Sequence, residues 1–389
     1  MMDFNRISKV VITCKDRAVS YLEQEVIALG FTPTFSTRTT VELDGSLNDC
    51  IFLNMHLRTA SMVLFELKSF PLRHARELYD KINVLPWEQC ISSDTYFSVA
   101  STVNHESVDN PLFVNVKIKD AIVDRFREIT GVRPDSGSDF EGAVIQLFWK
   151  NEEANVYLNT TGKTLAKHGY RKIPGLAPMM EDLAASTILA TEWDLKSPFV
   201  NPMCGAGTVA IEAAMLASNR YPGLYRDQYA FQHIKGYDPA YYDNLKKELE
   251  TKIQEPEGLI IIASDLSVDA LKDTKKNAQF AGVDHLIQLE HCDFADTTIP
   301  ESDNGILFFN PEYGERLGEL DALEETYDRI GNFMKQKCAG YTGFIFTGNL
   351  ELAKKVRLKA SRRIEFYNGT IDCRLLKYEL YKGTRVVKE

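Results

Sequence analysis

The sequence FVNPMCGAGT, which extends from Phe199 to Thr208, decides the fold of this chain. A short apolar run passes through a glycine-rich turn into a helical pattern that extends to residue 217. In doubly wound sheets, ligands bind outside the carboxyl ends of the strands, and glycines there let the backbone approach a ligand because they carry no Cβ. The turn lacks the third glycine of dinucleotide-binding loops and the Gly-Lys of phosphate loops. Although Gly-x-Gly also occurs in ordinary turns, the stretch predicts a ligand loop for a group other than phosphate.

The same alternation of short apolar runs and helices continues toward the C-terminus. Strands are predicted at 199–200, 259–263, 286–289, 306–309 and 343–346, and helices at 208–217, 268–281 and 320–337. Such alternation is typical of βαβ units that build a parallel sheet covered on both faces. Two further strands, at 363–367 and 373–381, are predicted to form a terminal hairpin.

Carboxylates stand where the second and third of these strands end. Asp265 ends the second strand, and a carboxylate at this position can bind both hydroxyls of a ribose. Asp293 and Phe294 follow the third strand, where the carboxylate can accept a hydrogen bond from an adenine amino group and the ring can pack against the base. Either aspartate alone is more often a helix cap or a solvated turn. Their order at successive strand ends favours a nucleoside site.

The fourth strand ends in Asn310-Pro311-Glu312-Tyr313. A planar amine is a poor nucleophile because its lone pair is delocalised into the ring, and two carbonyl acceptors on its hydrogens concentrate that pair on nitrogen. The Asn310 side chain and the Pro311 main chain can supply these acceptors, and Tyr313 can stack on the base, a contact worth about 1–3 kcal/mol. Any loop can contain an Asn-Pro turn. The hypothesis is transfer to an amine, which needs positioning rather than a strong base.

Residues 1–175 have a different pattern, in which helices alternate with strands of antiparallel appearance. The predicted elements are strands at 10–12 and 96–102, helices at 19–29, 71–82 and 111–129, and a hairpin of 143–149 with 154–159. The longest helix is closed by Gly131, and its apolar face comprises Val114, Ile118, Ile122, Phe126 and Ile129. We predict an α+β region that is separated from the parallel sheet at residues 160–178.

Composition narrows the classes of protein to consider. The chain has 389 residues, a net charge of −10, and seven cysteines without Cys-x-x-Cys spacing. The acidic charge argues against a protein that coats nucleic acid, although residues 1–175 are nearly neutral, with 20 Lys and Arg against 22 Asp and Glu. The spacing of the cysteines does not suggest a zinc site or a disulfide framework. No apolar run approaches the roughly 20 residues of a membrane span, and the N-terminus lacks signal-peptide features. We expect a cytoplasmic protein without a bound metal or membrane contact.

Longer stretches carry a resemblance to a known family. These stretches are LAKHGYR at 165–171, LAPMMEDLAA at 176–185, residues 201–219, residues 221–231 with Pro-Gly-Leu and Arg226, and YGERL at 313–317. Residues 310–313 also resemble the (Asp/Asn)-Pro-Pro-(Tyr/Phe) motif of amino-group methyltransferases. Over nearly the whole chain, the sequence resembles the bacterial 23S rRNA guanine-N2 (m2G) methyltransferases, which also carry the name N6-adenine-specific DNA methylases.

The resemblance implies a Rossmann-like class I methyltransferase domain at 178–389 that uses S-adenosyl-L-methionine, a linker at 158–177, and an RNA-binding region at 1–157 composed of a ferredoxin-like subdomain and a THUMP domain. The implied cofactor contacts are Ala177, Pro178, Asn201, Pro202, Cys204, Gly205, Gly207, Thr208, Asp265, Leu266, Asp293 and Phe294. The implied contacts to the target amine are Asn310, Pro311 and Tyr313. The implied RNA-binding cations are Lys117, Lys119, Arg127, Lys163, Lys167 and Arg171, although such runs usually mark a solvated face. The expected partner is large-subunit ribosomal RNA or its precursor.

One position departs from the family pattern, because Glu312 stands where a second proline is usual. A proline would hold the preceding residue in an extended conformation, whereas Glu312 lifts that restraint and adds a carboxylate near the reacting centre. Three alternatives therefore stay open: methylation of adenine N6 in DNA or RNA, methylation of a glutamine amide in a protein, and a catalytically silent RNA-binding assembly factor. The THUMP-like region favours RNA, and the flanking family features favour guanine.

Overall fold

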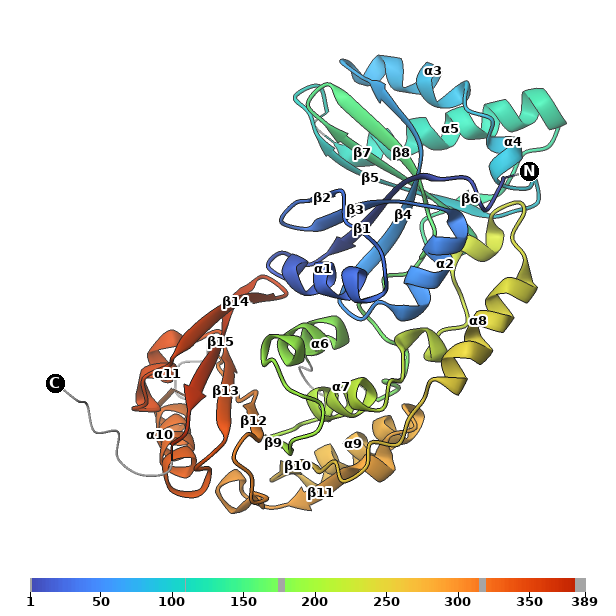
Figure 1. The fold of residues 1–389 in the computed structure, drawn as a ribbon. Coiled ribbons are helices and arrows are strands. Elements are labelled where there is room, and N and C mark those ends of the chain that lie inside the picture. The colour runs from blue at the N-terminus through green and yellow to red at the C-terminus, as the bar shows by residue number, and fades with distance from the viewer. Residues whose placement is uncertain (1, 109, 174–178, 315–319, 382–389) are drawn as a thin grey trace. The chain divides into compact units, whose positions relative to one another are not determined.

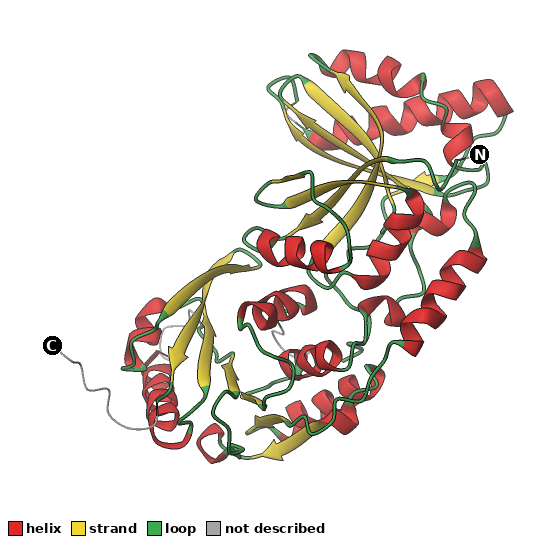
Figure 2. Cartoon of the chain, viewed as in Figure 1, coloured by secondary structure: helices red, strands yellow, loops and turns green. Residues whose placement is uncertain are grey.

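The computed structural model describes residues 2–108, 110–173, 179–314 and 320–381 (Figure 1, Figure 2). The chain forms two compact units. Unit 1 comprises Met1–Cys14, Leu22–Leu165 and Arg226–Leu249, and unit 2 comprises Lys15–Tyr21, Ala166–Tyr225 and Glu250–Glu389. Each unit therefore includes one short segment from the other unit's half of the sequence.

Unit 1 is built around an eight-stranded sheet of order β2-β3-β1-β4-β8-β7-β5-β6. Its strands are β1 (Ser8–Cys14), β2 (Phe35–Ser36), β3 (Thr40–Gly45), β4 (Ala60–Pro71), β5 (Phe97–Asn104), β6 (Ser136–Gly137), β7 (Ala143–Lys150) and β8 (Glu153–Asn159). Antiparallel pairing confirms the predicted hairpin of β7 and β8. The expectation of antiparallel strands is wrong for β5, which pairs in parallel with β6 and β7, because the 20-residue helix α5 (Pro111–Thr130) supplies a crossover between β5 and β7.

The helices in this half of the sequence follow the predicted pattern with two corrections. They are α1 (Val19–Ala28), α2 (Leu47–His56), α3 (Leu78–Asn83) and α4 (Trp87–Cys90), in addition to α5. The helix predicted from residue 71 is wrong at its start, because Pro71 ends β4 and pairs with Glu153, and helical turns begin only at Ala75. In α5 the predicted apolar face is buried except for Ile129, which is 54% exposed. Residues 127–131 are all exposed, so the helix extends about one turn beyond the core.

Unit 2 contains a seven-stranded sheet of order β11-β10-β9-β12-β13-β15-β14. Its strands are β9 (Phe199–Pro202), β10 (Ile261–Asp265), β11 (Ile287–His291), β12 (Ile306–Phe309), β13 (Thr342–Thr347), β14 (Arg362–Asn368) and β15 (Ile371–Glu379). The first five strands along the chain pair in parallel, and β15 is antiparallel to both of its neighbours. Numbered along the chain, these five have the order 3-2-1-4-5 of a doubly wound fold, which confirms the predicted architecture.

Successive residues of the inner parallel strands β9, β10, β12 and β13 enter two different cores, because side chains alternate across a strand. Phe199 and Phe308 pack with helices α6 (Glu181–Ala190), α7 (Thr208–Ala217) and α9 (Val268–Phe280) on one face. Val200 and Phe309 pack with α10 (Leu320–Lys337) and α11 (Leu350–Lys355) on the other. This burial on both faces explains why the strands appear in the sequence as continuous apolar runs.

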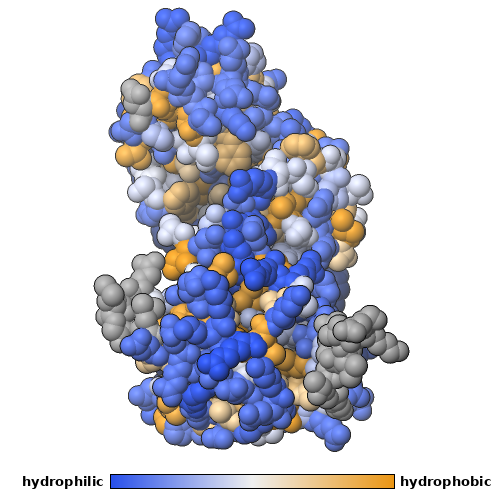
Figure 3. All heavy atoms as spheres, turned by 90° about the vertical axis from the view of Figure 1, so that its left-hand side faces the viewer, coloured by the Kyte–Doolittle hydropathy of each residue, from blue (hydrophilic) through white to orange (hydrophobic). Residues whose placement is uncertain are grey.

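The surface seen in Figure 3 is mostly hydrophilic, with hydrophobic side chains in small separate groups. Among the described helices, none has the length and apolarity to span a bilayer.

A buried amide ties helix α2 to the segment after β8. The Asn54 Nδ2 donates to Thr160 Oγ1 at 2.8 Å, and its Oδ1 accepts from Thr161 Oγ1 at 2.6 Å. Asn54→Ala would leave both buried hydroxyls without this partner, at a cost of about 1–3 kcal/mol. We expect a lower melting temperature for Asn54→Ala and no change for the matched variant Asn244→Ala, whose side chain is exposed on α8 (Pro239–Thr251). Equal melting of Asn54→Ala and the unchanged protein would contradict the assignment.

Candidate functional site

The carboxyl ends of β9, β10 and β12 lie at one edge of the unit 2 sheet, because these strands are parallel and adjacent. Two hydrogen bonds connect their ends. The Asn201 Nδ2 donates to the main-chain oxygen of Phe308 at 2.8 Å, and the Gly205 N–H donates to Asp265 Oδ2 at 2.9 Å. Residues predicted from three separate parts of the sequence are therefore brought together at this edge.

The turn after β9 passes through the left-handed region three times, at Met203 (φ 55°), Gly205 (φ 54°) and Gly207 (φ 79°). The two glycines serve different purposes. A Cβ on Gly207 would lie 2.4 Å from Thr274 Cγ2, so that position is closed by packing, whereas a Cβ on Gly205 would meet nothing within 4 Å. Gly205 therefore leaves open space above the backbone, which is the geometry expected of a ligand loop.

Helix α9 supports this turn through two polar residues that were not predicted from the sequence. The Thr274 Oγ1 donates to the Gly205 oxygen at 2.8 Å. The Asn277 Nδ2 donates to the main-chain oxygens of Ile173 and Ala206, and its Oδ1 accepts from the N–H of Ile173. Both side chains are fully buried. The only sequence signal was their place on the inner face of the helix, with Leu271 and Ala278.

The end of β10 presents a carboxylate beside an exposed apolar side chain. Asp265 uses Oδ2 for the Gly205 N–H and Oδ1 for the Ser267 N–H at 2.9 Å. The next residue, Leu266, is 71% exposed. The thiol of Cys204 is part of the same turn, and burial, together with the nearby Asp265, raises its pKa to about 12. The thiol is therefore protonated at neutral pH and is not prepared to act as a nucleophile.

Asp293 and Phe294 are held by a cation that was not predicted from the sequence. Asp293 Oδ1 accepts from Arg329 at 2.7 Å and from the Ala295 N–H at 2.9 Å. Burial alone would raise the pKa of Asp293, but these hydrogen bonds outweigh it and the pKa lies below its ordinary value. Phe294 is buried edge-to-face against Phe309, with the Arg329 guanidinium 4.9 Å from its ring centroid. Most of this ring therefore packs in the core.

The segment after β12 contains an acceptor without a donor. The Asn310 Oδ1 is buried and accepts no hydrogen bond from the described part of the chain, and Pro311 is also buried. Tyr313 is held by the hairpin of β14 and β15, because its hydroxyl accepts from Asn368 Nδ2 at 2.8 Å. Burial raises the pKa of Tyr313 to about 12, so its hydroxyl is neutral. The same segment thus holds a buried acceptor that lacks a donor among the described residues and a neutral phenol that is held by Asn368.

Arg171, which was predicted as an RNA contact, lies in the interior of unit 2. Its guanidinium donates to Glu181 Oε2 at 2.8 Å, to the Met179 oxygen at 2.8 Å and to Thr208 Oγ1 at 3.2 Å. It therefore braces the start of α7 and the chain before α6. Ala177 and Pro178 lie outside the described residues, and Pro202 is buried in β9.

The other predicted RNA contacts lie closer to the surface than Arg171. Lys163 and Lys167 are exposed, and Lys163 forms an ion pair with Glu141 at 3.2 Å. On α5, Lys117 and Lys119 are half-buried and Arg127 is exposed. The described residues include no group of three or more His, Cys, Asp or Glu side chains that could hold a metal ion.

A short N-terminal segment, Lys15–Tyr21, completes unit 2. The Lys15 ammonium forms an ion pair with Asp182 at 2.8 Å. The Arg17 guanidinium lies 4.2 Å from the ring centroid of Tyr367, and Tyr21 stacks on Phe366 with ring centroids 5.7 Å apart. These contacts hold the β14–β15 hairpin that carries Asn368. Nothing in the local sequence indicated them.

The doubly wound sheet with its antiparallel β15, and the loops gathered at its carboxyl edge, define a Rossmann-like methyltransferase fold. Residues 168–377 match the RMKL-like methyltransferase domain, and the chain belongs to this family. Residues 73–159 match the THUMP domain, and residues 9–64 match the RlmL ferredoxin-like domain. The predicted family resemblance and fold class are thereby confirmed.

Similar proteins agree with this assignment. The ribosomal RNA large subunit methyltransferase K/L of Syntrophotalea carbinolica is 32% identical over 370 residues, which cover 92% of this chain and 52% of that protein. The chain spans about half the length of the curated relatives it matches. A crystal structure of a protein assigned as a methyltransferase and complexed with SAH has a TM-score of 0.87 and 27% identity, over 98% of this chain and 100% of that one. A predicted N6-adenine-specific DNA methylase from Listeria monocytogenes has a TM-score of 0.87 and 26% identity, over 96% and 97%.

The two glycines of the turn should respond differently to alanine. Gly207→Ala drives a Cβ into Thr274 in addition to straining the backbone, whereas Gly205→Ala carries only the left-handed backbone cost of about 1–2 kcal/mol. We expect Gly207→Ala to melt at the lower temperature of the two, and Gly205→Ala to lose ligand binding while it stays folded. Thermal melting of both variants tests the order, and a higher melting temperature for Gly207→Ala would refute it.

Proposed function

We propose that this chain transfers a methyl group from S-adenosyl-L-methionine to an exocyclic amino group of RNA, namely guanine N2 of 23S rRNA. The observation that carries the proposal is the buried Asn310 Oδ1 that has no donor among the described residues, at the carboxyl edge of a methyltransferase sheet. The curated relatives are named large-subunit rRNA methyltransferases, and the THUMP match supports RNA as the substrate.

The residues at the sheet edge fit the cofactor. The open space over Gly205 would admit a ligand against the backbone, and the Asp265 carboxylate, held by two N–H groups, would receive ribose hydroxyls. The exposed side chain of Leu266 offers an apolar contact beside it. The bound cofactor supplies an electrophilic methyl group on a sulfonium. The Asp293 carboxylate is ionised at neutral pH, and its pKa lies below the ordinary value, so it would accept a hydrogen bond from the adenine amino group.

Asn310, Pro311 and Tyr313 would act on the target base. The Asn310 Oδ1 and the main-chain oxygen of Pro311 accept the two amine hydrogens, which concentrates the lone pair on nitrogen. Formation of the N–C bond would accompany cleavage of the S–C bond and leave the amine nitrogen positively charged. No strong base is needed, because this cationic nitrogen is acidic enough to release its proton to water. The neutral Tyr313 ring, fixed through Asn368, is available for stacking. Catalysis would then come mainly from orientation.

We expect the RNA to be bound mainly by unit 1, which contains the THUMP match. A base in a duplex cannot reach an enclosed methyl donor, so the target is flipped out or already unpaired. The proposed phosphate contacts are Lys117, Lys119, Arg127 and Lys163 of unit 1, together with Lys167, which belongs to unit 2. Arg171 is not included, because it is engaged inside unit 2. The substrate would be large-subunit rRNA or its precursor, in the cytoplasm.

The Asn310 amide is the decisive test. Asn310→Ala removes one of the two acceptors, and we expect methyl transfer to rRNA from cells lacking the protein to fall about 10²–10³-fold, as when a comparable transition-state hydrogen bond is lost. Binding of the cofactor, followed by calorimetry, should change less than twofold. Transfer is measured with a methyl-labelled cofactor, and the modified nucleoside is identified by mass spectrometry.

The control for Asn310→Ala is Asn332→Ala, an exposed position on α10, which should keep full activity. Undiminished transfer by Asn310→Ala would overturn the assigned role. Cofactor binding by the unchanged protein without transfer would favour the silent assembly factor. Methylation at adenine N6 would replace guanine as the target.

Substitutions of Arg171 and Lys163 should have different effects, because Arg171 has a structural role and Lys163 is proposed to bind RNA. Arg171→Ala leaves the buried Glu181 carboxylate without its partner, at a cost of about 3–5 kcal/mol, so melting temperature and cofactor affinity should both fall. Lys163→Ala should leave melting unchanged and reduce the salt dependence of RNA binding by about one phosphate contact. RNA binding measured at several salt concentrations checks this, and an unchanged slope for Lys163→Ala would count against its assignment.

A further inference from the structure

One stretch of the family pattern has no part in the proposed chemistry at the sheet edge. Residues 221–231 include Arg226, and the segment Arg226–Leu249 belongs to unit 1 although it lies within the match to the methyltransferase domain. This segment leaves the methyltransferase unit and packs on the unit that contains the THUMP match. Its placement needs an explanation other than cofactor or amine binding.

Hydrogen bonds hold residues 226–231 against residues 160–164, which follow β8. The Arg226 guanidinium donates to the main-chain oxygens of Lys163 and Thr164 at 2.7 and 2.8 Å and lies 5.0 Å from the ring centroid of Tyr229. The N–H groups of Ala230 and Phe231 donate to the main-chain oxygens of Thr161 and Thr160. Main-chain and charged hydrogen bonds therefore join two segments that are distant in sequence.

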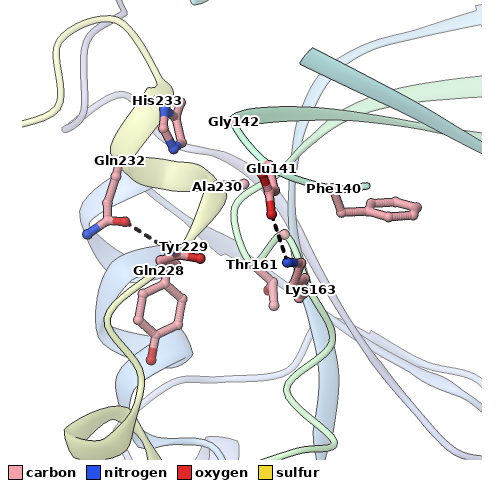
Figure 4. Close-up of a pocket in the computed structure, with 11 residues that line it drawn as sticks. Phe140, Glu141, Gly142, Thr161, Lys163, Gln228, Tyr229, Ala230, Gln232 and His233 are labelled. Atoms are coloured by element: carbon pink, nitrogen blue, oxygen red, sulfur yellow. Dashed lines mark hydrogen bonds and ion pairs between the residues drawn. The ribbon is translucent and has the colours of Figure 1, made fainter. Parts of the chain in front are cut away.

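Between these segments and the loop before β7 lies a pocket of about 350 Å³ (Figure 4). It is lined by Phe140, Glu141, Gly142, Thr161, Gly162, Lys163, Gln228, Tyr229, Ala230, Gln232 and His233. Figure 4 shows Gln232 and His233 on one wall and Glu141 and Lys163 on the other. The ring of Phe140 points away from the space between the walls, so this residue contributes its backbone.

The backbone of the pocket wall is strained at Phe140, which has φ 56°, a left-handed conformation that is rare for a bulky side chain. Gly142 (φ 73°) and Gly162 (φ 80°) are also left-handed, a conformation that glycine adopts without strain. A Cβ on Gly142 would lie 2.0 Å from the main-chain oxygen of Tyr96, so only glycine fits there. Strained backbone of this kind clusters at ligand-binding sites.

The polar groups around the pocket are available to a ligand. The ion pair of Lys163 with Glu141 is exposed, with side chains 58% and 61% accessible, so it contributes little energy and can be exchanged for a ligand phosphate. Gln228 is exposed, and its amide makes no hydrogen bond to the described part of the chain. Burial lowers the pKa of His233, so near pH 7 its ring is neutral and offers one donor and one acceptor.

We propose that this pocket is a subsite for one unpaired nucleotide of the RNA substrate, with the phosphate beside Lys163 and the base edge at Gln228 and His233. The proposal rests on the proposed function for the identity of the polymer. The volume lies within the range of small-ligand pockets, about 300–1,000 Å³. A base in a duplex has its edge paired and cannot enter, whereas unpaired bases are the usual targets of specific RNA recognition. A neutral amide and imidazole suit base edges, and the single lysine suits one phosphate.

The test compares two fluorescent probes on the full chain. One is a single-stranded RNA of about 12 nucleotides, a length within the usual site sizes for single strands, and the other is its duplex with the complementary strand. For Gln228→Ala/His233→Ala, we expect the affinity for the single strand to fall about tenfold and the affinity for the duplex to change less than twofold. Lys163→Ala should weaken binding of both probes and flatten the salt dependence.

The matched control is Gln24→Ala/His74→Ala, which removes the same two side-chain types from exposed positions of unit 1 and should bind both probes normally. Melting temperatures verify that all variants are folded. Unchanged affinity of Gln228→Ala/His233→Ala for the single strand, or an equal loss for both probes, overturns the pocket. Methyl transfer is measured separately. If the unchanged protein transfers no methyl group, the proposed function is wrong, and the comparison of the two probes still decides whether the pocket binds an unpaired nucleotide. Failure of the unchanged protein to bind either probe overturns the pocket, whereas the proposed function is still decided by methyl transfer to rRNA.

Discussion

The hydrogen bond from the Gly205 N–H to the Asp265 carboxylate is the contact on which the sheet edge depends. It joins the turn after β9 to the end of β10, and it forms only because the chain passes through left-handed conformations at Met203 and Gly205. A second N–H, from Ser267, holds the other oxygen of Asp265. The carboxylate is thus oriented during folding, so a ligand does not have to order it on binding.

Buried polar side chains at this edge fall into two groups. Asn277 and Arg171 make several hydrogen bonds each and hold chain segments in place. Asn310 and Asn201 are different, because the Oδ1 of each is buried and has no donor among the described residues. Buried polar groups are normally satisfied, since an unpaired one costs about 1–3 kcal/mol. A satisfied group indicates structure, and an unsatisfied one at a strand end indicates a place for a ligand.

Each of the two units includes a short segment that lies, in sequence, among the residues of the other unit. Lys15–Tyr21 belongs to the methyltransferase unit, where Lys15 pairs with Asp182 and Tyr21 stacks on Phe366. Arg226–Leu249 belongs to the unit with the THUMP match, where Arg226 is bonded to main-chain oxygens. Neither unit is therefore a continuous stretch of sequence, and a cut at any single point of the chain separates one unit from part of its own packing.

The sequence by itself determined the doubly wound sheet and the strand ends at which Asp265, Asp293 and Asn310 stand, because local periodicity and turn residues act over a few positions. Tertiary structure alone decided that β5 is parallel, that Pro71 ends a strand, and that Arg171 is buried. It also revealed Thr274, Asn277, Arg329 and Asn368 as supports of the site. Their roles depend on partners far away in the chain, and pairing across such distances leaves no periodic trace in the local sequence.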